Sequence, residues 1–477
     1  MLQNKDIAKI QEVKTFFKDT WVQPEFFVKH LGILNFSKTS KLFNSVKKSG
    51  VPFWDLMKLI LVLPFMDMGS LGSVFNGKTT VGTKAQKDTY YRALANQKMD
   101  WRNLLLLFVK RYLSKFTTPK DSHKCLIFDD TDIKKRGKKI EGASKVFNHV
   151  DHRFILGFKL LVAGYWDGSV FIPVDFSFHR GSKNNKKKKY GLSNKQRKQQ
   201  KKTKRKKGLP VNKRFKELNA KKTDMVVDMF KRINKRKIEV DYILLDSWFT
   251  SISLINKISG VNKKVHVIGM YKYNSKLSIG GKKYSIKQLR KHRGKISRAR
   301  SLRLYYFQYV GEINGAKVKV FISKRGVNGA WHTIITTNTK LTFKKAMEIY
   351  STRWTIEVFF KEAKQLLGLG KCQSTNFDVQ VAQTTITMLQ YLLISLKHRV
   401  EAYQSIGGIF KNIKQGYIEH KLNERLLLAI VEILEVLDLL IEDIDINSIA
   451  RRLVLYSESL AFLNSPPNSL NRSKLVG

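Results

Sequence analysis

Several polar residues recur on one side of a predicted helix near residue 350, where they could bind metal ions and phosphate groups. Four of them stand at offsets of 0, 3, 7 and 14, namely Tyr350, Arg353, Glu357 and Lys364. At about 100° per residue these offsets fall within one stripe of an α-helix, and Lys361 lies beside that stripe. A carboxylate flanked by a phenol and cations suits a metal ligand among phosphate contacts. The same spacing also suits a surface helix with Arg353–Glu357 and Glu357–Lys361 ion pairs.

Further acids directly follow two predicted strands. The apolar run 125–128 ends at Asp129 and Asp130, and the run 240–245 ends at Asp246. Phosphodiester cleavage needs an activated water and a stabilised leaving oxygen, and two Mg²⁺ ions about 3.5–4 Å apart can supply both. Carboxylate oxygens are ligands that Mg²⁺ prefers. Asp129, or its neighbour Asp130, could therefore join Asp246 and Glu357 in a two-metal site.

The order of the surrounding elements predicts how these acids meet. Strands are expected at 155–165 and 170–178, joined by the turn signal Asp167-Gly168, and a helix is expected near 215–233. A strand, a hairpin, a helix and a further strand, followed by a helix that carries an acid, indicate a ribonuclease-H-like α/β core. The first and fourth strands of such a core lie side by side, which brings their terminal aspartates together.

The rest of the chain divides by composition. Residues 260–340 are β-rich and include a predicted hairpin at Asn314-Gly315, and one long helix is expected from Phe343 to Leu367. Further helices are expected at 379–400, 422–441 and 449–462. The predicted domains are a helical DNA-binding domain (1–120), the first part of the core (121–250), a β-rich insertion (251–340), the second part of the core (341–377) and a helical C-terminal domain (378–477).

The charge of the chain points to a polyanionic partner. Its 90 Lys and Arg outnumber 37 Asp and Glu, which gives a net charge of +53. Nucleic acid is the usual partner of such a protein. The basic run 183–207, predicted to be disordered in the free protein, suits phosphate contacts. The apolar stretch 56–66 is shorter than the roughly 20 residues of a spanning helix, and no secretory signal is recognisable, so a cytoplasmic, DNA-associated protein is expected.

The motifs resemble those of a known family. Tyr350-x₂-Arg353-x₃-Glu357-x₆-Lys364 matches the Tyr-Arg-Glu-Lys motif of the bacterial DDE transposases of insertion-sequence family four. The Asp-x-Thr that begins at Asp129 and the segment 245–249 (Leu-Asp-Ser-Trp-Phe) resemble the two catalytic strand ends of that family. The β-rich stretch before Glu357 resembles its insertion. The resemblance covers about residues 120–375.

The resemblance implies roles for these residues. Asp129, Asp246 and Glu357 would be the catalytic, metal-binding triad with two Mg²⁺ ions, for which Mn²⁺ can substitute. The phosphates of the transposon end would be contacted by Tyr350, Arg353 and Lys364, with Lys361 beside them, and Trp331 is the candidate for stacking a flipped base. The partners implied are terminal inverted repeats and target DNA, bound by a homodimer, with neither a membrane nor a small-molecule substrate.

Other functions stay open on the sequence alone. A related nuclease would cut DNA without joining it, and a DNA-binding descendant of a transposase would do neither, although such a descendant is expected to have lost a carboxylate. An RNA-binding protein is disfavoured because no motif of the common RNA-binding modules is present. The leading hypothesis is a transposase that cleaves DNA and transfers strands at insertion-sequence ends.

Overall fold

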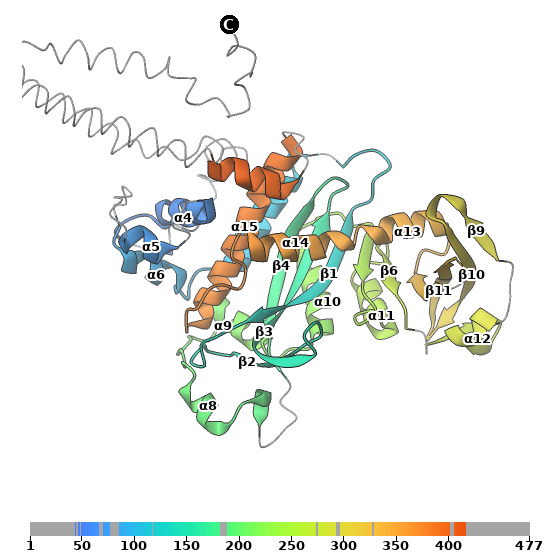
Figure 1. Ribbon diagram of the computed structural model, residues 1–477, viewed down its shortest axis with the longest axis horizontal. Helices are drawn as coiled ribbons and strands as arrows, with labels where there is room; N and C mark the ends of the chain where they lie inside the picture. Colours follow the sequence, from blue (N-terminus) through green and yellow to red (C-terminus); the bar gives the residue numbers. More distant parts are fainter. Residues whose placement is uncertain are drawn as a thin grey trace, which may run out of the picture.

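The computed structural model describes most of the middle of the chain (Figure 1). The described residues are 43, 46–47, 49–65, 70–76, 85–116, 118–181, 188–272, 275–291, 296–326, 329–400 and 405–415. The helices predicted at 422–441 and 449–462 therefore lie outside the described residues.

Short helices form the described part of the N-terminal region. They are α4 (Phe53–Val62), η1 (Leu63–Phe65), α5 (Leu71–Asn76), α6 (Lys87–Leu94) and α7 (Trp101–Leu113). The Asp100 side chain caps α7 by accepting the backbone N–H of Asn103 at 3.0 Å. Eight of the ten residues of α4 are buried, so this helix belongs to the hydrophobic core rather than to the surface.

A mixed sheet of twelve strands runs through the molecule. Its first six strands are β1 (Cys125–Lys134), β2 (Ser144–Asn148), β3 (Arg153–Trp166), β4 (Phe171–His179), β5 (Tyr242–Leu245) and β6 (His266–Met270). Strands β1, β5 and β6 are parallel neighbours, whereas β3 pairs antiparallel with β1. The predicted α/β class is confirmed as a mixed sheet with helices, and the predicted neighbours β1 and β5 do lie side by side.

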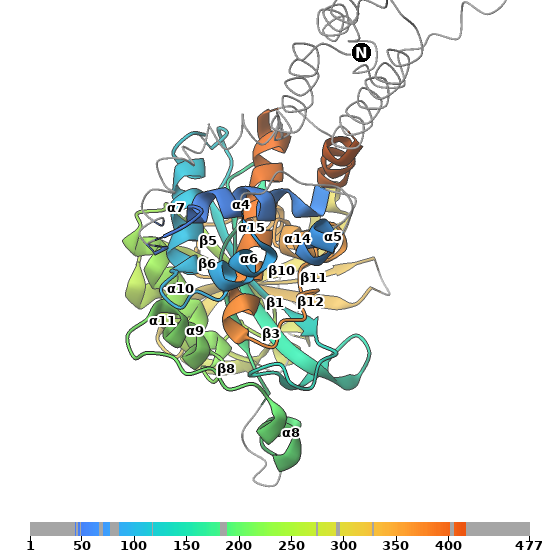
Figure 2. The same ribbon diagram turned by 90° about the vertical axis from the view of Figure 1, so that its left-hand side faces the viewer.

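Helices cover both faces of this part of the sheet. Between β4 and β6 lie η2 (Lys189–Gly191), α8 (Asn194–Gln199), α9 (Pro210–Glu217), α10 (Lys222–Lys235) and α11 (Ile252–Val261). After the last strand come α13 (Phe343–Ser351), α14 (Trp354–Gln365) and α15 (Phe377–Val400). Figure 2 shows α10 and α11 on one side of β1 and α14 on the other. Strand β1, which carries Asp129, therefore packs against α14.

The β-rich region extends the same sheet. It comprises β7 (Lys276–Ile279), β8 (Lys282–Ser285), α12 (Ile286–Lys291), β9 (Ser297–Ala299), η3 (Arg300–Leu302), β10 (Leu304–Ile313), β11 (Ala316–Arg325) and β12 (Trp331–Thr336). The predicted hairpin turn joins β10 to β11, with positive φ angles of 47° at Asn314 and 80° at Gly315. Such angles suit a two-residue turn of the Asn-Gly type. Strand β12 pairs with β6, so the ladder continues unbroken into the core.

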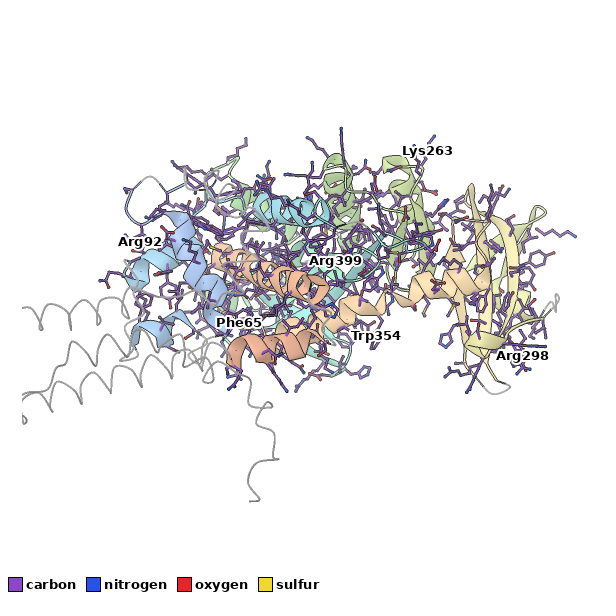
Figure 3. All side chains as sticks on the ribbon, turned by 90° about the horizontal axis from the view of Figure 1, so that it is seen from above. Phe65, Arg92, Lys263, Arg298, Trp354 and Arg399 are labelled. Atoms are coloured by element: carbon purple, nitrogen blue, oxygen red, sulfur yellow. The ribbon has the colours of Figure 1, made fainter. Side chains whose placement is uncertain are left out.

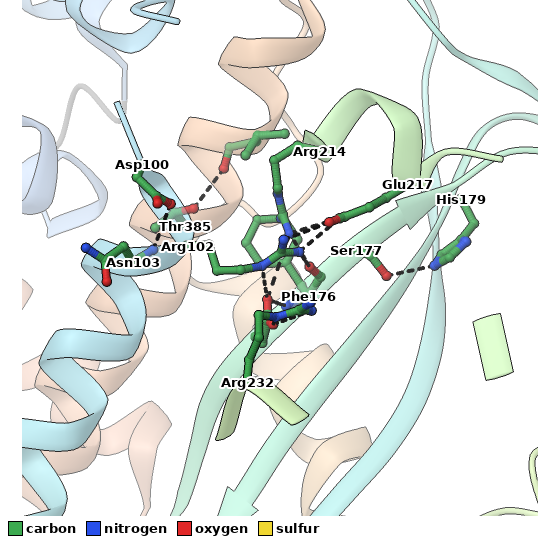
Figure 4. Close-up of polar contacts among 12 residues, drawn as sticks. Asp100, Arg102, Asn103, Phe176, Ser177, His179, Arg214, Glu217, Arg232 and Thr385 are labelled. Carbon is green, nitrogen blue, oxygen red and sulfur yellow. Dashed lines mark hydrogen bonds and ion pairs between the residues drawn. The ribbon is translucent and has the colours of Figure 1, made fainter. Parts of the chain in front are cut away.

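A buried ionic network fastens the N-terminal helices to the core (Figure 4). Arg102 of α7 donates to Asp175 of β4 at 2.8 Å and contacts both carboxylate oxygens of Glu217 at 2.7 and 2.9 Å. Arg214 and Arg232 approach Asp175 from α9 and α10. Burial opposes the charge of Asp175, but Arg102 and Arg232 outweigh it and lower the pKa of this carboxyl. Losing Arg102 would remove ion pairs from two buried carboxylates at once, which is destabilising.

Two expectations from the sequence need correction. The single helix predicted from Phe343 to Leu367 is two helices, because the hydroxyls of Ser351 and Thr352 bond back to the carbonyls of Glu348 and Ile349 at the break. The start of the predicted C-terminal domain, α15, is a core helix packed on α7 and β4. By length and apolar character α15 could also cross a membrane, but 94% of its apolar window is buried within the protein.

The second correction concerns the basic run, which was expected to be disordered. Its part from Lys188 to Lys207 folds against the core and contains η2 and α8. Helix α11 and strand β6 fall within residues 251–340, and β6 is a parallel partner of β5.

Candidate active site

Strand β1 presents its acids on two opposite faces, because successive side chains of a strand alternate. On one face Asp129 is 3.2 Å from the guanidinium of Arg353, and Thr131 accepts a hydrogen bond from Lys364 at 2.7 Å. On the other face Asp130 is 2.9 Å from the Lys222 ammonium. The adjacent residues Asp129 and Asp130 therefore lie on opposite faces of β1. Asp129 faces α14, whereas the charge of Asp130 is neutralised by Lys222 on the other face.

Asp246 follows the last residue of β5 and lies next to Asp129. In the parallel pairing Phe128 is opposite Leu245, so the next residues of the two strands are the two aspartates. Strands in a sheet are about 4.8 Å apart. One oxygen of Asp246 accepts the backbone N–H groups of Trp248 and Phe249, each at 2.9 Å. This turn fixes the carboxylate at the end of the sheet.

A glycine on β6 makes room for that turn. The Thr250 hydroxyl donates to the backbone carbonyl of Asp246 at 2.6 Å. A Cβ atom at Gly269 would lie 2.2 Å from this hydroxyl oxygen, so the position excludes any side chain. Sequence reasoning missed both residues, since an isolated glycine and threonine carry no spacing signal.

The third acid, Glu357, is linked to Asp129 through arginine. Glu357 lies in the first turn of α14, and the Arg353 guanidinium contacts it at 2.6 Å while also reaching Asp129. Tyr350 belongs to α13 instead, where its buried hydroxyl donates to the carbonyl of Leu245 at 3.2 Å. The Tyr350 phenol therefore contacts the last residue of β5, directly before Asp246.

The electrostatics of the site favour a cation. Burial, and then the neighbouring charge of Asp246, raise the pKa of Asp129 to about 7, although Arg353 acts in the opposite direction. Within the described part of the chain, no three acidic, histidine or cysteine side chains are already grouped closely enough to hold a metal ion. Instead the Arg353 guanidinium connects the first acid to the third.

The family follows from the sequence match over these elements. A family model described as the transposase DDE domain matches residues 120–393, which span β1 to α15. The chain belongs to this DDE transposase family. The match includes Asp129, Asp246 and Glu357 within one domain. No significant match to a curated protein was found.

The chain is similar to a solved transposase structure. It is a cryo-EM structure of the piggyBac transposase synaptic complex with hairpin DNA. The two share 12% sequence identity with a TM-score of 0.38, and the alignment covers 86% of this chain and 80% of the other.

The remaining residues predicted for DNA contact lie at different places in the DDE domain. Lys361 is exposed on α14, one turn beyond Glu357. Burial lowers the pKa of Lys364, whose ammonium bonds Thr131 beside the acids. Trp331 lies in the extended sheet, where its ring stacks on Phe307 at 5.7 Å between centroids. The structure therefore brings Arg353 and Lys364 to the acids and leaves Trp331 apart from them.

Two exposed tryptophans beside the acids were not singled out as site residues. Trp248, two residues after Asp246, is 50% exposed, and the Lys222 ammonium lies 3.9 Å from its ring centre. Trp354, one turn before Glu357, is 62% exposed and projects from α14 in Figure 3. Large exposed aromatic rings next to a phosphate-cleaving site can stack on nucleic-acid bases. Their positions in the sequence, close to Asp246 and Glu357, were the signal that could have identified them.

Proposed function

We propose that this DDE transposase cleaves DNA at the ends of an insertion sequence and transfers the freed strands to target DNA. One observation carries the proposal: Asp129 and Asp246 directly follow the paired stretch of two adjacent parallel strands, and Arg353 links Glu357 to the first of these aspartates. The arrangement supports a ribonuclease-H-like core with these three acids as its catalytic residues. It also supports Asp129 rather than Asp130, which is paired with lysine.

The residues fit divalent metal ions by their chemistry. Asp129 and Asp246 form a neighbouring pair of oxygen donors, and burial together with the charge of Asp246 raises the pKa of Asp129 to about 7 even though Arg353 is in contact with it. We propose that Asp129, Asp246 and Glu357 hold two Mg²⁺ ions, which Mn²⁺ can replace. When bound, such ions activate the attacking water and stabilise the leaving oxygen.

Residues of the chain itself hold the three acids in position in the absence of DNA. Arg353 keeps Asp129 and Glu357 on the same side of the sheet, and backbone N–H groups orient Asp246. We propose that Arg353, Lys361 and Lys364 contact the phosphates of the terminal inverted repeats. Tyr350 would act through the position of β5, and Trp331 would stack a flipped base. We further propose a homodimer on paired DNA ends, in the cytoplasm of a bacterial cell.

The domains proposed from the sequence shift accordingly. The core would comprise residues 121–270 and 341–400, and the insertion would comprise the strands from β7 to β12. The helices before residue 120 would contact DNA as a domain attached through Arg102. This division keeps β6 and α15 with the strands and helices on which they pack.

The function is tested with the full chain and linear DNA that carries the terminal inverted repeats of its own element. With Mg²⁺ or Mn²⁺ we expect nicking at the repeat boundary, followed by joined products when target DNA is added. EDTA, or scrambling of the repeats, should abolish both. Cleavage without joined products would assign a nuclease instead. Binding without any cleavage would assign a DNA-binding descendant.

Arg353 should oppose metal binding in the absence of DNA. Its guanidinium contacts two of the three proposed ligands, so Arg353→Gln should bind Mn²⁺ more tightly in calorimetric titration of the DNA-free protein. Cleavage should nevertheless fall, by about 10–100-fold, because the ligand positions are no longer fixed.

The matched control for this prediction is Lys364→Gln. It removes the same charge from the same helix, but its ammonium bonds Thr131 rather than an acid. Metal affinity should therefore change less. Weaker Mn²⁺ binding by Arg353→Gln would contradict the competition between arginine and metal.

A further inference from the structure

Two basic segments far apart in sequence form one surface beyond the end of β1. The first is 134–139, Lys-Lys-Arg-Gly-Lys-Lys, where β1 ends, and the second is 188–207. The backbone N–H of Lys201 donates to the carbonyl of Lys139 at 2.9 Å, which places the segments side by side. Gln200 adds a side-chain bond to the carbonyl of Ala143 at 2.6 Å. We call these two segments the basic platform.

A buried arginine pins the second segment in place. The Arg205 side chain is only 4% exposed, and its guanidinium contacts Asp378 at 2.8 Å and both oxygens of Glu141 at 2.5 and 3.0 Å. Thr203 donates its backbone N–H to Glu141 at 2.7 Å. Arginine is suited to this role because its planar fork bonds carboxylates in a bidentate manner. The second segment is therefore held against the rest of the protein by buried ion pairs and hydrogen bonds.

The lysines around this anchor are directed to solvent. The first segment exposes all of its cations except Lys135, whose ammonium donates to the carbonyls of Gly370 and Cys372. The second segment exposes Lys195, Lys198, Lys201, Lys202, Lys204, Lys206 and Lys207. No acid occurs in either segment, and the nearby Glu141 is neutralised by Arg205. A fixed array of exposed cations without acids is complementary to a line of phosphates.

We infer that the basic platform binds the phosphate backbone of duplex DNA that extends away from the cleavage site. This inference rests on the proposed function for its partner. Lys134 lies five residues beyond Asp129 on β1, which corresponds to about 17 Å along the strand. Phosphates of one DNA strand are spaced about 3.4 Å apart. The platform would thus contact phosphates roughly five or more base pairs from the cut, and Figure 2 shows α8 projecting beyond the sheet at that end.

Salt dependence of binding tests the platform. Lys138, Lys139, Lys201 and Lys202 are all changed to Gln in the platform variant, and Lys235, Lys237, Lys263 and Lys264 are changed to Gln in the control variant. All eight lysines are exposed, and each variant removes four charges from the +53 of the chain. The control lysines lie near the starts of β5 and β6, opposite the catalytic ends, and Lys263 points outward in Figure 3.

The measurement is fluorescence anisotropy of a 30-base-pair duplex, at about ten salt concentrations and without divalent metal. Each phosphate contact contributes about 0.9 to the slope of log K against log salt. The slope of the platform variant should be smaller than that of the wild type by up to about 3.6. The slope of the control variant should be smaller by less than about 0.9, which corresponds to one contact. Equal losses in the two variants, or no loss in the platform variant, would overturn the inference. Tighter binding of single-stranded RNA than of the duplex would overturn it as well.

A second variant tests the anchor. Arg205 is itself buried, so Arg205→Gln removes no exposed cation. If Arg205 fixes the platform, the slope should still fall, and limited trypsin digestion should cut faster at Lys201 and Lys202. An unchanged slope and digestion rate would contradict the anchoring role, and circular dichroism reports whether the variant folds.

The outcomes for the platform and for the proposed function are separable. Wild-type cleavage of repeat ends with normal salt dependence in the platform variant would reject the platform alone. Absence of cleavage by the wild type, with the expected loss of slope in the platform variant, would reject the transposase activity and keep the platform.

Discussion

Asp129→Asn should abolish cleavage of repeat ends, whereas Asp130→Asn should retain most of it. The two residues are adjacent in sequence but lie on opposite faces of β1: Asp129 faces Asp246 and Arg353, and Asp130 faces Lys222. A catalytic metal contributes several kcal/mol to the transition state. Because about 1.36 kcal/mol corresponds to tenfold in rate, loss of one metal ligand should cost on the order of 10³-fold.

Thermal melting distinguishes a catalytic effect of Asp129→Asn from unfolding. Burial and Asp246 raise the pKa of Asp129 to about 7 from 3.8, so its ionised form destabilises the fold, an effect that grows above pH 3.8 and is complete above about pH 7. Asparagine removes that charge without changing the shape. At pH 8 the variant should therefore melt at the same temperature as the wild type or higher. Loss of cleavage in Asp130→Asn, with Asp129→Asn active, would reverse the assignment.

Glu357→Gln should reduce cleavage by a similar factor, on the order of 10³-fold, and leave DNA binding intact. Its carboxylate is the acid that Arg353 links to Asp129. The matched variant is Glu362→Gln, five residues along α14, where the Tyr391 hydroxyl donates to the acid at 2.9 Å on the side that packs against α15.

The two glutamate variants are compared by single-turnover nicking in Mg²⁺ and by anisotropy of the same DNA. Glu362→Gln should cut nearly as well as the wild type, because its acid is separate from the two aspartates. Efficient nicking by Glu357→Gln would remove this residue from the site. Weaker DNA binding without a slower nicking step would assign it to substrate binding instead.

The central part of the fold could be predicted because its signals are local. The apolar runs before Asp129 and Asp246, and the Asn314-Gly315 turn, depend on strand and turn chemistry that a short segment contains. Adjacency of β1 and β5 followed from the order of elements. The face of β1 on which each acid lies follows from alternation along the strand, but the choice of face depends on helices packed on it.

Other features depend on contacts between distant segments, which no single-sequence pattern reveals. The helix break after Ser351 results from hydroxyl groups that also occur within unbroken helices. Arg205 orders the segment 188–207 only because the fold brings Glu141 and Asp378, which are distant in sequence, into contact with its guanidinium. The same is true of Arg102, which finds its acids in β4 and α9. Charge density alone predicted disorder where buried ion pairs produce order.

The unbroken hydrogen-bonded ladder from β12 through β6 to β5 has a mechanical consequence. Strand β5 ends at Leu245, so Asp246 is attached to a sheet that also carries β10 and β11. A torque on the outer strands would be transmitted through backbone hydrogen bonds rather than through a hinge. A load on the distal strands would therefore reach the backbone next to Asp246 through the sheet itself.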